Sequence, residues 1–119
     1  MKHIPLNQQT KLSSDICGQL LEVVNRNDFP FGIVLLENIQ TTDPHYHKKS
    51  QKCYWMLEGW VKVIVEHIHS GDSHQLTLDT GDLLTIEPYE KHQIIAGSKD
   101  NQMVVVTSPP WSAEDVIID

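Results

Sequence analysis

The chain has 119 residues, of which 39% are hydrophobic and 21% charged, and its formal net charge at pH 7 is -7. This length suits one domain, residues 1–119, with a core that needs neither disulfides nor a structural metal. The excess of acidic residues, sixteen against nine basic ones, argues against binding to nucleic acids or to anionic membranes, because both require a basic surface.

The sequence contains no segment that resembles a signal peptide or that has the apolar length of a membrane-spanning helix. Its two cysteines, Cys17 and Cys53, lack the CxxC spacing of redox and zinc sites, so we expect free thiols. These features predict a cytoplasmic protein whose partners include neither a membrane nor a nucleic acid.

Short apolar segments of strand length alternate with turn residues along the chain. The expected strands cover residues 18–25, 31–40, 52–59, 60–69, 74–79, 83–90, 92–97 and 102–108. Near the end, residues 112–119 (SAEDVIID) predict one or two helical turns with Ser112 as N-cap. About eight or nine short strands and almost no helix indicate an all-β sandwich or barrel.

The pattern is clearest in residues 60–69. Val61, Val63 and Val65 alternate there with residues of the opposite parity, which is the period of a half-buried strand. Only a Glu-Gly turn separates this segment from residues 52–59, so the two predict a β-hairpin.

Two His-x-His pairs stand out, His45 with His47 and His67 with His69. Alternate residues of a strand point to the same side, so each pair presents two imidazoles together, as a divalent metal requires. Seven histidines in a chain of this length make such pairs common by chance, so the context must decide. The second pair continues the parity of the valines beyond the end of a strand, and we interpret it as part of the rim or surface.

The surroundings of the first pair resemble the two motifs of the cupin superfamily, Gly-x5-His-x-His-x3,4-Glu-x6-Gly and Gly-x5-Pro-x-Gly-x2-His-x3-Asn. His45, His47 and Gly59 match the first motif, and Gly81 and His92 match the second. The resemblance implies a cupin double-stranded β-helix, which is a jelly-roll barrel. It also implies a divalent transition metal (Fe, Ni, Zn, Cu or Mn) bound through the three histidines.

The resemblance covers about residues 40–96 and is incomplete. Lys52 stands where the motif has its glutamate ligand, so three of the four usual ligands remain. The other motif positions that differ are occupied by Ile39, Glu87, Tyr89 and Ala96. The stretch YWMLEG is similar to YYVLEG, which is common in small cupins.

Lys52 leaves three alternatives open, because a protonated lysine has no lone pair for a metal. Three histidines can hold the metal and leave more positions open, as in the cupin cysteine and diketone dioxygenases. Lys52 can instead point inward and bind an anionic ligand, with or without metal, as a general base or an amine nucleophile. In the third alternative its stem is buried and its head reaches Glu58 or Glu90 at the mouth of the barrel.

Other residues follow from the parity of the strands. Tyr54 shares the face of Lys52, where it either offers its hydroxyl to a substrate or is an ordinary core residue. Met56 is expected to fill the core. Ile94 and Ala96 are expected to line the pocket with His92. Trp60 and Trp111 are expected on the outside or at a dimer interface.

Functions from three classes are consistent with these residues. We favour a small-molecule enzyme of the metal-dependent dioxygenase type. GDLLTIEPYEKHQI (residues 81–94) is also similar to cupins of the mannose-6-phosphate isomerase type, so a sugar-phosphate isomerase or epimerase is an alternative, although Arg26 is the only arginine. The third is a non-catalytic module for a small ligand. Small cupins often pair, so we expect a homodimer.

Overall fold

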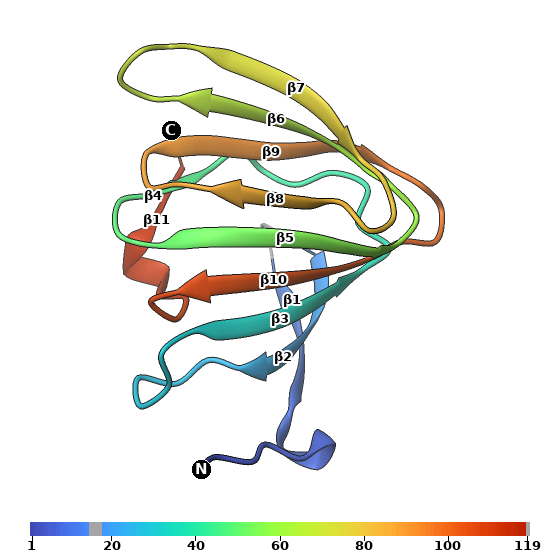
Figure 1. The fold of residues 1–119 in the computed structure, drawn as a ribbon, viewed down its shortest axis with the longest axis vertical. Coiled ribbons are helices and arrows are strands. Elements are labelled where there is room, and N and C mark those ends of the chain that lie inside the picture. Colours follow the sequence, from blue (N-terminus) through green and yellow to red (C-terminus); the bar gives the residue numbers. More distant parts are fainter. Residues whose placement is uncertain (15–17, 119) are drawn as a thin grey trace.

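The computed structural model describes residues 1–14 and 18–118, and strands dominate this part of the chain (Figure 1). In chain order the elements are the 3-10 turn η1 (Leu6–Gln8), β1 (Thr10–Ser14), β2 (Gly18–Val24), β3 (Gly32–Glu37), β4 (Tyr46–His47), β5 (Gln51–Glu58), β6 (Val61–His67), β7 (Ser73–Leu78), β8 (Leu83–Ile86), β9 (Glu90–Gly97), β10 (Gln102–Ser108), the 3-10 turn η2 (Ala113–Asp115) and β11 (Val116–Ile117). Each expected strand range overlaps an observed strand, so the all-β prediction is confirmed.

Two antiparallel sheets form the barrel. The larger has the order β1-β2-β3-β10-β5-β8, the smaller has the order β7-β6-β9, and β4 pairs with β11 in a short third sheet. The core lies between the two main sheets. Five core residues are each at most 3% exposed: Leu36 and Met103 of the larger sheet, and Val61, Val63 and Ile94 of the smaller.

The predicted β-hairpin between residues 52–59 and 60–69 is wrong. β5 pairs with β10 and β8, whereas β6 pairs with β7 and β9. The chain therefore passes from one sheet to the other at Gly59, whose φ of 74° suits glycine. Alternation cannot distinguish a hairpin from such a corner, because both leave the apolar sides of the two strands facing the core.

A register shift in β9 changes one of the expected pocket residues. Ile94 pairs with the buried Val63, but Ala96 pairs with the exposed Lys62. One extra residue in a strand moves the following side chain to the other face. Ile94 therefore shares the inner face of His92 as predicted, and Ala96 does not. Neither residue lines the cavity beside His45, and Ile94 is instead part of the core.

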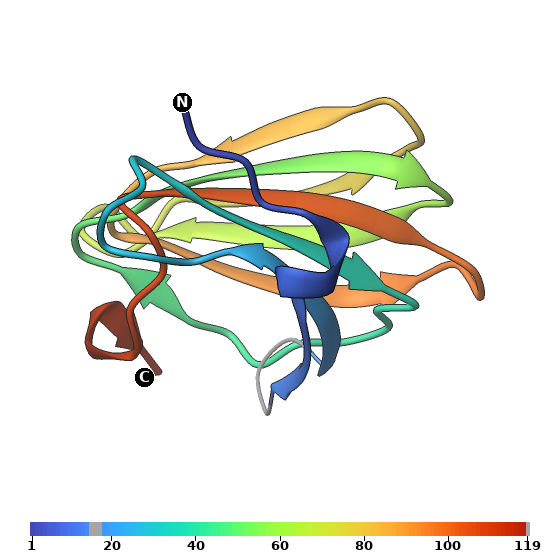
Figure 2. The same ribbon diagram turned by 90° about the horizontal axis from the view of Figure 1, so that it is seen from below.

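The C-terminal segment forms the expected helical turn, but only as η2 (Figure 2). Ser112 precedes the turn at the N-cap position, and its side chain makes no capping hydrogen bond. The chain then continues into β11, where Val116 pairs with His47 and Ile117 with Tyr46. The sequence predicted none of β1, β4 and β11.

The structure bears on the expected free thiols and on membrane-spanning helices only for the residues that it describes. Cys53 is a free, partly buried thiol, and Cys17 lies outside the described residues. In the described part of the chain, none of the helices has the length and apolar character needed to span a bilayer.

Candidate metal centre

The backbone brings the three predicted histidines together. His45 forms an isolated antiparallel bridge with His92, and each residue donates its backbone N–H to the carbonyl of the other, at N···O distances of 3.1 and 2.9 Å. His47 follows in β4, with its side chain on the same side as that of His45. All three residues are at most 3% exposed.

The ring nitrogens of this cluster form a coherent ligand set. Nδ1 of His45 lies 3.0 Å from the carbonyl oxygen of Asp43, and Nδ1 of His92 lies 2.9 Å from that of Glu90. A carbonyl oxygen only accepts hydrogen bonds, so both Nδ1 atoms carry the proton and both Nε2 atoms keep a lone pair.

One candidate ligand nitrogen from each of the three histidines lies within 4.8 Å of the other two. Nε2 of His47 and Nε2 of His92 are buried and have no hydrogen-bond partner. A buried polar atom without a partner is costly, and metal ligation is one way to satisfy it. The histidine cluster therefore fits a divalent metal ion, and in the described part of the chain it is the only such group of three.

Burial keeps the cluster in the form that can bind a metal. Burial first, and the positive charge of Lys52 second, lower the pKa of His45 to about 4 and that of His47 to about 3. The pKa of His92 is lowered well below its usual value for the same two reasons. All three imidazoles are therefore neutral at pH 7.

Asp115 supports the cluster from the C-terminal segment, and the sequence analysis missed this role. Its carboxylate accepts backbone N–H groups of Lys48, Lys49 and Ser50, each at 3.0 Å, and Oδ2 lies 3.8 Å from Nδ1 of His47. Burial alone would raise the pKa of Asp115, but hydrogen bonds from Ser50 and from the backbone of Lys48 and Lys49 hold it below its usual value. The loop after His47 is thus anchored on one buried carboxylate.

Lys52 points into the barrel and is 5% exposed. Its Nζ lies 3.3 Å from Nε2 of His45, so the amine sits beside the histidine cluster. This position favours the two alternatives with Lys52 near the site over the one in which it reaches Glu58 or Glu90. An ammonium group only donates hydrogen bonds, so here it shares the Nε2 lone pair that a metal on His45 would use.

A cavity of about 320 Å³ opens beside His45, Lys52 and Tyr54. Tyr54 is 4% exposed and lines this cavity, as one of its two predicted roles requires.

Met56 is fully buried in the core, as expected. Trp60 and Trp111 are 36% and 43% exposed, as expected, and Trp111 in addition lines the cavity. The two prolines before Trp111 redirect the chain after β10, which strand parity does not predict.

The second His-x-His pair lies apart from this cluster. The rings of His67 and His69 are 5.8 Å apart, and His69 packs 4.9 Å from the ring of Tyr89. His67 is partly buried and His69 is exposed, which agrees with the interpretation of this pair as part of the rim.

No family model and no curated protein matches the sequence. Solved structures do match. Oxalate decarboxylase from Bacillus subtilis has a TM-score of 0.78 and 17% identity over 95% of this chain and 30% of its own. A variant of the Streptomyces protein PAC13 with uridine has a TM-score of 0.78 and 14% identity over 98% of this chain and 89% of its own. A protein from Planctomyces limnophilus has a TM-score of 0.73 and 19% identity over 98% and 95% of the two chains.

These similarities confirm the cupin fold that the histidine motifs predicted. Another structure of the Bacillus subtilis oxalate decarboxylase concerns its Mn(II) centres, and it covers 95% of this chain at 17% identity with a TM-score of 0.76. This chain spans less than a third of the length of that enzyme, 31% in this case. At these identities the likeness concerns the fold alone.

The lowered histidine pKa values predict how the stability of the metal-free protein depends on pH. An unfolded histidine titrates near 6.5, whereas folded His47 titrates near 3, so the unfolded chain takes up a proton first as the pH falls. The contribution of His47 to the free energy of unfolding is present above pH 6.5 and is lost between that pH and about 3. From pH 7 to 5, we expect the free energy of unfolding of a His47→Gln variant to fall less than that of the wild type, by roughly 2 kcal/mol. Urea unfolding measures both, and equal losses would contradict the prediction.

The Asp115 contacts predict a role in metal affinity. Asp115→Asn removes the charge near His47 and weakens the acceptor for the loop, so we expect divalent metal to bind about 10- to 100-fold less tightly. Competition with a chelator measures this affinity. The control is Glu114→Gln, because Glu114 is the exposed neighbour and its variant should bind as the wild type does. Unchanged affinity in Asp115→Asn would show that His47 is oriented without this carboxylate.

Proposed function

We propose that the protein binds one divalent transition metal through His45, His47 and His92 and catalyses a dioxygenase-type reaction on a small molecule in the adjacent cavity. The convergence of the three imidazoles carries this proposal, together with the two buried Nε2 atoms that lack a partner. Imidazole ligands suit Fe, Ni, Zn, Cu and Mn, so the metal is assigned as a class. A redox-active ion of this class would supply the activation of dioxygen.

The residues of the chain have separate roles in this proposal. Asp115 and the backbone carbonyls of Asp43 and Glu90 orient the imidazoles. Lys52 and Tyr54 stand on the cavity wall, where an ammonium group and a hydroxyl can position a substrate. The apolar walls keep water away from the reacting groups.

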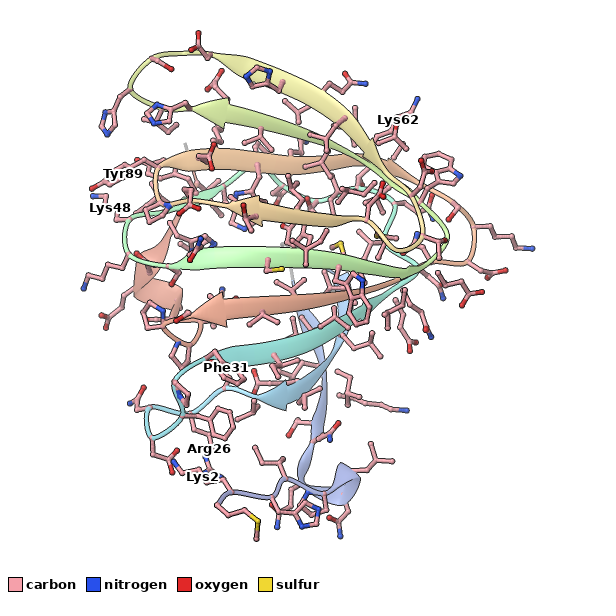
Figure 3. The ribbon with its side chains drawn as sticks, in the orientation of Figure 1. Lys2, Arg26, Phe31, Lys48, Lys62 and Tyr89 are labelled. Carbon is pink, nitrogen blue, oxygen red and sulfur yellow. The ribbon has the colours of Figure 1, made fainter. Side chains whose placement is uncertain are left out.

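The alternative of a sugar-phosphate isomerase or epimerase has less support. Its substrate is a polar dianion, and the cavity is lined mainly by aliphatic side chains. Arg26 lies at the far end of the molecule beside Lys2 (Figure 3), where both contact the exposed Asp28. A non-catalytic module for a small ligand would use the same cavity, and only turnover distinguishes it from the enzyme.

We also propose a homodimer formed by the outer face of the larger sheet. On this face Trp55 and Leu83 are paired neighbours, 46% and 60% exposed, and Val104 lies beside Trp55. The outer face of the smaller sheet instead carries polar residues such as Lys62 and Thr77. Apolar sheet faces pack on each other in β-sandwiches, and a second copy offers a matching face. A cytoplasmic location remains our expectation.

The metal proposal predicts the composition of the purified protein. We expect the untagged protein, prepared without chelator, to contain about one transition metal per chain. His47→Ala should lose it, because one of three buried ligands is missing. Elemental analysis measures both proteins, and His69→Ala is the matched control from the other His-x-His pair. A wild type that neither contains nor takes up Fe, Ni, Zn, Cu or Mn would refute the proposal. Oxygen consumption by the iron(II) form with candidate substrates then tests the reaction.

The dimer proposal predicts that a charge on the outer face of the larger sheet separates the copies. We expect light scattering after gel filtration to give twice the chain mass for the wild type and the single-chain mass for Trp55→Lys. Thr77→Lys places the same charge on the other sheet and should remain dimeric. A monomeric wild type, or a dimeric Trp55→Lys variant, would contradict the interface.

A further inference from the structure

The walls of the cavity set the character of its ligand. They come from the inner faces of β1, β2, β3 and β10, and the aliphatic residues that line them are Leu12, Leu20, Val24, Val34, Leu36 and Val105. Such walls offer no hydrogen bonds, so a polar body would lose its contacts with water without replacement. The body of the ligand must therefore be apolar.

Three buried polar residues line the cavity from β5 and β10, whereas Glu22 and Asn25 line it from β2 and its end. Lys52 pairs with Thr107 across β5 and β10, and Tyr54 pairs with Val105 in the same register. Lys52, Tyr54 and Thr107 are each at most 5% exposed, and all line the cavity beside His45. Lys52 is the only lysine or arginine in the described lining, so this side attracts a negative charge.

The donors at this side fit a carboxylate better than a phosphate. A phosphate group is usually held by several cationic or backbone N–H donors, whereas this lining supplies one cation, Lys52, and neutral donors on Thr107, Tyr54, Asn25 and Trp111. In an apolar cavity a single charge pair is stronger than in water.

Glu22 limits the negative charge that a ligand can carry at the opposite side of the cavity. It lines the cavity from β2, and the sheet order places β3 and β10 between β2 and the β5 strand of Lys52. Three strand spacings separate the two side chains by about 14 Å along the sheet. A second anionic group at that end would meet the carboxylate of Glu22, so the ligand carries one negative charge.

On the basis of the proposed function, we propose that the substrate is a small monocarboxylate with an apolar body. Its carboxylate lies at Lys52 and Thr107, next to the histidine cluster, and its body lies between the aliphatic residues of the larger sheet. The carboxylate is thereby placed within reach of the metal position, and Lys52 determines which substrates bind.

Matched acids and amides test this proposal in the wild type. The ligands are hexanoate, octanoate and 4-phenylbutyrate, each with its primary amide, which has nearly the same shape and no charge. Calorimetry at pH 7 measures binding to the protein as purified. We expect at least one acid to bind ten or more times more tightly than its amide. Equal affinities, or no binding of any acid, would overturn the proposal, and neither result depends on a variant.

The variant Lys52→Met then tests whether Lys52 is the residue that recognises the negative charge of the ligand. This variant keeps an apolar stem and should bind each acid and its amide equally. The control is Lys62→Met, because Lys62 projects outward from β6 (Figure 3) and is exposed; its preference for the acid should be unchanged. A preference that persists in Lys52→Met would overturn the role of Lys52.

The metal content of the same samples separates this inference from the proposed function. A preference for acids in a protein that binds no metal would support the ligand class and refute the metalloenzyme. A protein with a full complement of metal that does not distinguish acids from amides would support the metal site and refute the ligand class.

Discussion

The contact between Lys52 and His45 governs what this site can do. The Nε2 atom of His45 has one lone pair, which either accepts a hydrogen bond from the ammonium group or binds a metal ion. The motif glutamate would attract a cation at this position, whereas Lys52 repels one. A ligand carboxylate beside Lys52 offsets that repulsion. Metal and anionic ligand should therefore favour each other's binding, a coupling that is reciprocal by thermodynamic necessity.

The histidine cluster is assembled from two distant segments of the chain, and a third segment, which carries Asp115, supports it. Reciprocal hydrogen bonds join His45 to His92, and Asp115 gathers the amides that follow His47. Ligand groups with fixed rotamers and fixed protonation lose little freedom when they bind. The carbonyl partners of the Nδ1 atoms complete this arrangement. The site is thus prepared for a metal by contacts made elsewhere in the fold.

Strand periodicity and motif spacing predicted much of this structure, and the failures have local physical causes. The positions of the main strands and the side of β5 on which Lys52 and Tyr54 lie follow from alternation. The meeting of His45, His47 and His92 follows from the resemblance to the cupin motifs. A single extra residue in β9 turned Ala96 to the other face, and the corner at Gly59 has the same pattern as a hairpin. Asp115 acts on residues more than sixty positions earlier in the chain, and no local pattern encodes such a contact.

The pairing of β11 with β4 makes the loop that carries His47 depend on the last few described residues. Few contacts hold a two-residue strand, so this end of the molecule opens more readily than the barrel. A protease cut after Trp111, or a purification tag that pulls on β11, would release Asp115 and leave the barrel intact. The chain would then remain folded, and a metal bound at the histidine cluster would exchange faster. The choice of which terminus to tag therefore affects the result of a metal analysis.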